Sequence, residues 1–162
     1  MARDFTPITR SELLIRIRES AGDASERTAA RLLSLAHEIG AEEIPAHRAI
    51  SVRLPVPEMD YSGWLTLYVV SEAGTVYVNW LDRWADAGAP DVLADEYEQT
   101  FKDILRVKQL KFHPSAYKRA VPLEFVTANY QRVSQHITAT TDRLAHYVQK
   151  SGSGPTRRLT SA

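Results

Sequence analysis

The chain has 162 residues, of which 44% are hydrophobic, and it carries 20 basic side chains, 20 acidic side chains and no cysteine. This composition is typical of one globular domain, and it excludes disulfides, thiolate nucleophiles and cysteine-ligated metal centres. The longest apolar stretch, residues 64–70, is far shorter than a membrane helix, and the first residues lack the apolar core of a signal peptide. We therefore expect a soluble cytoplasmic protein that has no membrane association.

The net charge of zero hides a division along the chain. Residues 1–103 carry ten basic and eighteen acidic side chains, a balance of −8, and the remaining 59 residues carry +8. Such asymmetry is typical of a surface for nucleic acid or for an acidic partner, or of two segments that fold against each other. Internal cancellation is the simpler explanation, because charged residues on helices usually face solvent.

Two helices are expected near the N-terminus. Thr9 and Glu12 have the spacing of a capping box, and apolar residues follow at helical spacing. Asp23 and Glu26 repeat this pattern before an apolar stripe that ends at Gly40, a residue suited to a left-handed helix cap.

Three strands are expected next, over residues 50–56, 64–70 and 75–81. The first alternates apolar and polar side chains between prolines, and the other two are rich in aromatic and β-branched residues. Gly74 lies in the short connection between the second and third strands, where it can adopt the positive φ that such a hairpin loop commonly needs. Consecutive strands of this kind predict a three-stranded antiparallel meander.

Two more helices are expected after the strands, and the second of them is long. The first begins behind Pro90, and the second carries an apolar stripe from Leu123 to about Gln149. Residues 151–162 have linker composition and are predicted to form a disordered tail. The predicted fold class is therefore α+β, with residues 1–150 as one globular domain.

The predicted sheet has a second apolar face. Strict alternation places Trp64, Tyr68 and Tyr77 together on the face opposite Val69 and Val78. A face this apolar must be shielded from water, either by a helix of the same chain, by a second subunit, or by a ligand or partner. An internal helix is the simplest cover. The first functional hypothesis nevertheless makes Trp64, Tyr68 and Tyr77 partner-binding residues.

No catalytic constellation is apparent, so we favour neither an enzyme nor a bound cofactor or metal. The glycines are isolated, which leaves no phosphate-binding loop, and the five histidines form no pair with metal-ligand spacing. Asp142 and His146 have the spacing of a surface ion pair on a helix. A nuclease would need a lysine beside its metal-binding acids, and none occurs before residue 102; Asp60, Glu72 and Asp82 are candidates only if they converge in the fold.

One segment has the composition of a nucleic-acid contact. Residues 105–119 interleave cations, which neutralise phosphates, with aromatic rings, which stack on bases. The candidate residues for nucleic-acid binding are Arg106, Lys108, Lys111, Phe112, Lys118 and Arg119. Five bases fall short of a strongly basic domain, and aromatic residues in a connector are more often core anchors, so this hypothesis is the alternative.

The sequence carries no family motif that could name a function. We expect a small binding or interaction module that self-associates or binds a protein partner, because catalytic parts are missing while apolar surface and charge asymmetry are in excess. A nucleic-acid-associated protein is the first alternative, and a hydrolase or nuclease is the second.

Overall fold

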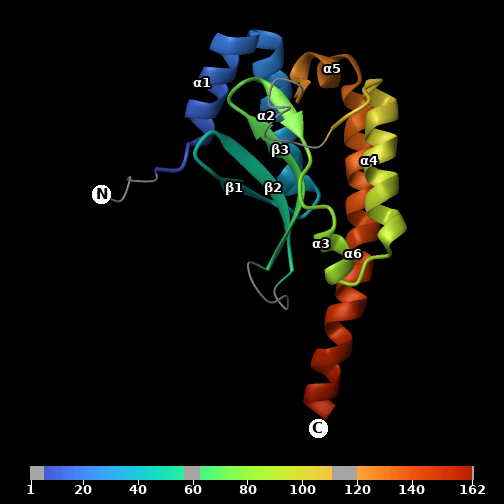
Figure 1. The fold of residues 1–162 in the computed structure, drawn as a ribbon. Helices are drawn as coiled ribbons and strands as arrows, with labels where there is room; N and C mark the ends of the chain where they lie inside the picture. The colour runs from blue at the N-terminus through green and yellow to red at the C-terminus, as the bar shows by residue number, and fades with distance from the viewer. Residues whose placement is uncertain (1–5, 57–62, 111–119, 162) are drawn as a thin grey trace.

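The computed structural model describes residues 6–56, 63–110 and 120–161, with side chains described up to Val148. The fold is α+β, as predicted, and its sheet is antiparallel throughout. Figure 1 shows the sheet with α1 and α2 on one side of it and the later helices grouped together beside it.

The two N-terminal helices form where the sequence predicts them. α1 spans Arg10–Ala21, and the Thr9 hydroxyl accepts a hydrogen bond of 3.1 Å from the Glu12 amide, which is the first half of the predicted capping box. α2 spans Asp23–Glu38 and buries the predicted apolar stripe. Gly22 joins the two helices with a φ of 92°, a conformation that the absence of a Cβ makes accessible.

The sheet contains the predicted meander with one further strand at each edge. Its order is β1-β2-β3-β4-β5. The meander strands are β2 (Ala49–Pro55), β3 (Trp64–Ser71) and β4 (Thr75–Tyr77). The prediction of three strands missed β1 (Glu42–Pro45) and β5 (Val121–Pro122), which are too short to show an alternation pattern. β4 is also shorter than the predicted 75–81, since Trp80 turns the chain with a left-handed φ of 57°.

The helices after the sheet outnumber the predicted two. They are α3 (Arg83–Asp86), α4 (Asp91–Leu105), α5 (Leu123–Ala128) and α6 (Tyr130–Ser161). α4 is the helix predicted behind Pro90, whereas no pattern predicted the short α3. The predicted long helix is divided at Asn129, whose φ of −129° and ψ of 22° lie outside the helical region. α6 continues through residues 151–161, whose side chains lie outside the described part, so the disordered tail stays a prediction.

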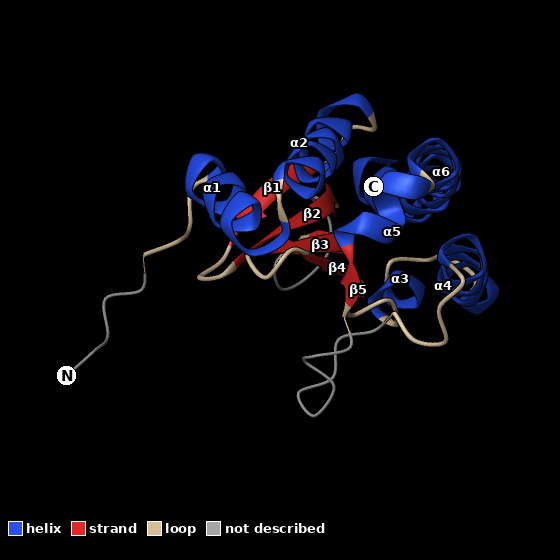
Figure 2. Cartoon of the chain, turned by 90° about the horizontal axis from the view of Figure 1, so that it is seen from above, coloured by secondary structure: helices blue, strands red, loops and turns tan. Residues whose placement is uncertain are grey.

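The helices leave one face of the sheet without a helical layer. α1 and α2 pack on one face, while α3, α4 and α6 stand beside the edge that β3 exposes beyond β4 (Figure 2). Apolar side chains from both groups of helices join those of the sheet in one buried core. Among the described helices, none lies over the opposite face in either view. None of them is long and apolar enough to span a membrane.

Candidate functional site

The strand register defines the face that no described helix covers. Residues directly opposite each other in antiparallel strands share a face. Ile50 pairs with Val70 and Val52 with Tyr68, and all four are buried on the side of α1 and α2. The opposite side, here called the helix-free face, carries Ser51, Arg53, Trp64, Thr66, Val69 and Tyr77. Arg53, Trp64 and Tyr77 are its half-buried members, and Ser51, Thr66 and Val69 are buried.

The prediction that Tyr68 and Tyr77 share a face is wrong. Tyr77 lies directly opposite Val69, because the β3–β4 loop has three residues and Ser71 pairs with Thr75. In this register, odd-numbered residues of β3 share a face with odd-numbered residues of β4. The prediction instead placed odd-numbered residues of the second strand on the same face as even-numbered residues of the third. Tyr68 is fully buried instead, and its hydroxyl donates to the Leu32 carbonyl of α2. Burial also raises the pKa of the Tyr68 phenol. A helix of the same chain therefore covers Tyr68.

A β-bulge brings Trp64 to the helix-free face. The β2–β3 register shifts next to Arg53, so that Arg53 lies opposite Thr66 and β3 contains one extra residue. If residues 64–68 all alternated regularly, Trp64 would share the covered face with Tyr68, because residues four apart lie on the same face of a regular strand. Two of the three predicted partner-binding residues, Trp64 and Tyr77, thus lie on one face. No periodicity in the sequence reveals the bulge.

Two buried aromatic side chains fix the bulge. The Trp84 indole in α3 donates to the Thr66 carbonyl at 3.1 Å, and the Tyr97 hydroxyl in α4 donates to the Leu67 carbonyl at 2.8 Å. β4 pairs only with residues 69–71 of β3, so these donors stand in for a missing neighbouring strand. The two rings lie 5.0 Å apart between centroids and strengthen this arrangement. The helical layer therefore orients Arg53 and Trp64.

Arg53 is the most unusual residue of the helix-free face. Its Nε is buried and has no hydrogen-bond acceptor within the described residues. Burial lowers the pKa of its guanidinium, and the charge of Arg83 lowers it further. Glu42 lies opposite Arg53 in the register, yet no ion pair joins them in the described part of the chain.

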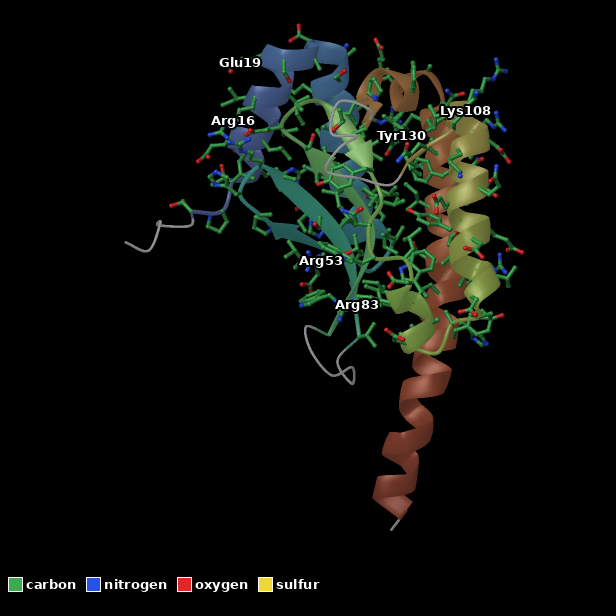
Figure 3. All side chains as sticks on the ribbon, viewed as in Figure 1. Arg16, Glu19, Arg53, Arg83, Lys108 and Tyr130 are labelled. Carbon is green, nitrogen blue, oxygen red and sulfur yellow. The ribbon has the colours of Figure 1, made fainter. Side chains whose placement is uncertain are left out.

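Arg83 is the first residue of α3, and Trp80 lies in the turn that precedes this helix. Figure 3 shows Arg53 and Arg83 near each other at one end of the sheet. The Arg83 amide donates to the Trp80 carbonyl at 3.2 Å, which closes a tight turn. Trp80 is 56% exposed and holds a positive φ, a conformation unfavourable for a bulky residue. An exposed, strained aromatic residue in the turn before Arg83 is typical of a binding surface.

The basic segment predicted to bind nucleic acid is described only in part. Arg106 and Lys108 are exposed, and Arg106 ends α4 in the left-handed conformation. Lys108 lines a hollow of about 430 Å³ together with Phe125, which is 41% exposed. The other four candidates, Lys111, Phe112, Lys118 and Arg119, lie outside the described residues.

The acids considered for a hydrolase do not form one site. Asp60 lies outside the described residues, and Glu72 forms ion pairs with Arg16 and Arg48. Asp82 lines a cleft of about 370 Å³ between α3 and α4. No group of three metal-ligating side chains occurs within the described ranges.

The surface ion pair predicted for the last helix is absent. No ion pair joins Asp142 to His146 within the described part of α6. The His146 ring instead contacts that of Tyr147, with 6.1 Å between centroids.

A groove between α2 and α6 is the other notable cavity. Its volume is about 570 Å³, and Glu38 and Ser134 are among its lining residues. The Arg31 guanidinium lies 3.7 Å from the centroid of the Tyr130 ring, a cation–π contact within the groove. The mixed lining favours no particular class of ligand.

Comparisons with protein-family models, with curated proteins and with solved structures find no match to this chain. The residues themselves must therefore carry any functional inference. Among the described sites, the helix-free face combines half-buried aromatic rings with cations that have no carboxylate partner in the described part of the chain.

Proposed function

We propose that this protein is an interaction module that binds an anionic segment of another protein on the helix-free face. The observation that carries the proposal is the presence of Trp64, Tyr77 and Arg53 together on a face that no described helix covers. Aromatic residues and arginine are the residue types that contribute most to protein interfaces.

Charge complementarity favours an anionic partner over a second copy of this chain. A symmetric dimer places a surface patch against the same patch of its partner. A dimer centred on Arg53 and Arg83 would bring these cations near those of the second copy, and like charges oppose each other across an interface. A segment carrying carboxylates or another anion meets the same cations favourably. The self-association expected from the sequence is therefore an outcome for the test to exclude.

Selection from a degenerate peptide library tests the proposal even though the natural partner is unidentified. The wild-type protein is expected to enrich peptides that carry anionic side chains, and Arg53→Gln and Trp64→Ser are expected to lose the enrichment. Arg106→Gln is the matched control, since Arg106 is an exposed arginine at the end of α4. Absence of enrichment, or enrichment that Arg53→Gln leaves unchanged, would refute the proposal.

The mass in solution separates this function from the two alternatives. A monomer is expected by light scattering. A dimer that Trp64→Ser converts to a monomer would show that a second copy occupies the face. Low-micromolar binding of single-stranded RNA at 150 mM salt, lost in Lys108→Gln, would instead favour the nucleic-acid hypothesis.

A further inference from the structure

The two arginines at the end of the helix-free face form an electrostatically incomplete cluster. Arg53 comes from β2 and Arg83 from α3. Trp84, which follows Arg83, donates to the carbonyl of Thr66, the residue opposite Arg53, and Figure 3 labels both arginines at the same end of the sheet. Burial lowers the pKa of the Arg53 guanidinium, and the charge of Arg83 lowers it further.

Carboxylates near the cluster do not neutralise it within the described residues. Glu42 faces Arg53 across the β1–β2 register, and Asp82 and Asp86 flank Arg83 in the sequence. No ion pair links any of these acids to either arginine in the described part of the chain. The buried Nε of Arg53 also has no acceptor there, and a buried donor without an acceptor is destabilising.

We propose that Arg53 and Arg83 together bind a phosphate monoester dianion, carried as a phosphorylated side chain by the anionic segment that docks on the helix-free face. This inference rests on the proposed function and specifies the ligand chemistry. A single carboxylate is satisfied by one arginine in a bidentate contact, whereas a phosphate monoester offers three peripheral oxygens and a charge between about −1.5 and −2 at pH 7. Two guanidinium groups match that charge.

The neighbouring residues support a phosphorylated segment over free phosphate. Trp80 precedes Arg83 by three residues and is 56% exposed, and Trp64 lies on the same face as Arg53. These rings provide apolar contacts for the residues that flank a phosphorylated side chain, whereas inorganic phosphate has no apolar group that could contact them. Recognition of a phosphorylated motif by clustered arginines follows the same chemistry.

Three forms of one fluorescent peptide test the dianion requirement. The peptide is taken from the library selection, with phosphoserine, glutamate or serine at the selected anionic position, and binding is followed by fluorescence anisotropy. The phosphopeptide is expected to bind about tenfold or more tightly than the glutamate peptide, because charge-assisted hydrogen bonds are made to both arginines. Arg53→Gln and Arg83→Gln should each weaken it by about tenfold or more, and Arg106→Gln should not.

Acidification provides a second readout. The second pKa of a phosphoserine is about 6, so between pH 6 and pH 5 the dianion is lost. The affinity of the phosphopeptide is expected to fall by up to about tenfold over this range, while the glutamate peptide is unaffected because its carboxyl titrates lower.

Melting temperatures without ligand test whether the arginines are unpaired. Arg53→Gln is expected to leave the melting temperature unchanged or raise it, since it removes a cation that has no acidic partner among the described residues. A fall of several degrees that Glu42→Gln or Asp60→Asn reproduces would mean that the chain's own acids neutralise the cluster, which would overturn the inference.

The remaining outcomes separate this inference from the proposed function. Equal binding of the phosphopeptide and the glutamate peptide, unaffected by Arg83→Gln, would overturn the phosphate assignment and leave the proposed function standing. Failure of every peptide would refute both. Inorganic phosphate that stabilises the wild type and both arginine variants equally would show adventitious binding only, against the inference.

Discussion

Tyr97→Phe tests whether the helical layer holds the β-bulge that orients the helix-free face. The Tyr97 hydroxyl donates to the Leu67 carbonyl at 2.8 Å, and the two residues are 1% and 0% exposed. The substitution keeps the ring, which contacts Trp84 and Phe101, and removes only this hydrogen bond. A buried carbonyl left without a donor costs about 1–3 kcal/mol. For a domain of this size, each kcal/mol lowers the melting temperature by about 2–4 °C.

Urea unfolding followed by circular dichroism and by tryptophan fluorescence measures this loss. The free energy of unfolding is expected to fall by about 1–3 kcal/mol with an unchanged dependence on denaturant. Tyr147→Phe is the control, since no hydrogen bond of its hydroxyl is found within the described residues, and it should change stability by less than about 0.5 kcal/mol. If Tyr97→Phe changed the free energy of unfolding as little as the control does, the Tyr97 hydroxyl would not stabilise the bulge.

Four further substitutions or deletions probe the backbone, the pH response and the C-terminus. Trp80→Gly is expected to raise the free energy of unfolding by up to about 1 kcal/mol, because glycine tolerates the φ of 57°; a loss in chemical denaturation would show that the ring packs on the surface. Gly74→Ala should cost about 1–3 kcal/mol more than Gly40→Ala, since both have positive φ but only the Cβ at Gly74 would meet the last residue of α1, at 2.6 Å; equal losses would contradict this packing. Burial lowers the pKa of His136, so the unfolded chain binds the proton more readily, and stability should fall as the pH drops below about 6.5; unfolding at pH 7.5 and 5.5 should show a smaller fall in His136→Gln. Deleting residues 151–162 should change the melting temperature by less than about 2 °C, as their composition buries little apolar area, and a larger drop would show that the segment docks.

Local rules predicted the elements that depend on neighbouring residues. The capping spacing of Thr9 and Glu12 placed the start of α1, and the aromatic and β-branched run of residues 64–70 identified β3. These signals rely on contacts a few positions apart, which sequence spacing encodes directly.

Features that depend on contacts between residues far apart in the sequence could not be predicted from local spacing. The bulge in β3 exists beside donors from Trp84 and Tyr97, which are 18 and 30 residues away from their acceptors. Arg53 in β2 likewise interacts with Arg83 in α3, a helix of four residues that is too short to show a periodic pattern in the sequence. The face on which each predicted contact residue lies therefore depends on the three-dimensional register. The two arginines were missed, and the one available signal was an arginine at a polar position of the first predicted strand.

The spacing of residues around the bulge in β3 determines which face of the sheet Trp64 occupies. Loss of Leu67 would remove the bulge and leave Trp64 on the helix-free face. Insertion of one residue between Trp64 and Thr66 would instead shift the alternation by one position and turn Trp64 toward the core beneath α1 and α2. Such an insertion would leave the composition of the strand almost unchanged, yet it would remove an aromatic ring from the surface and force it into a filled interior. Substitutions that keep the spacing should therefore be tolerated more readily than an insertion in this short stretch.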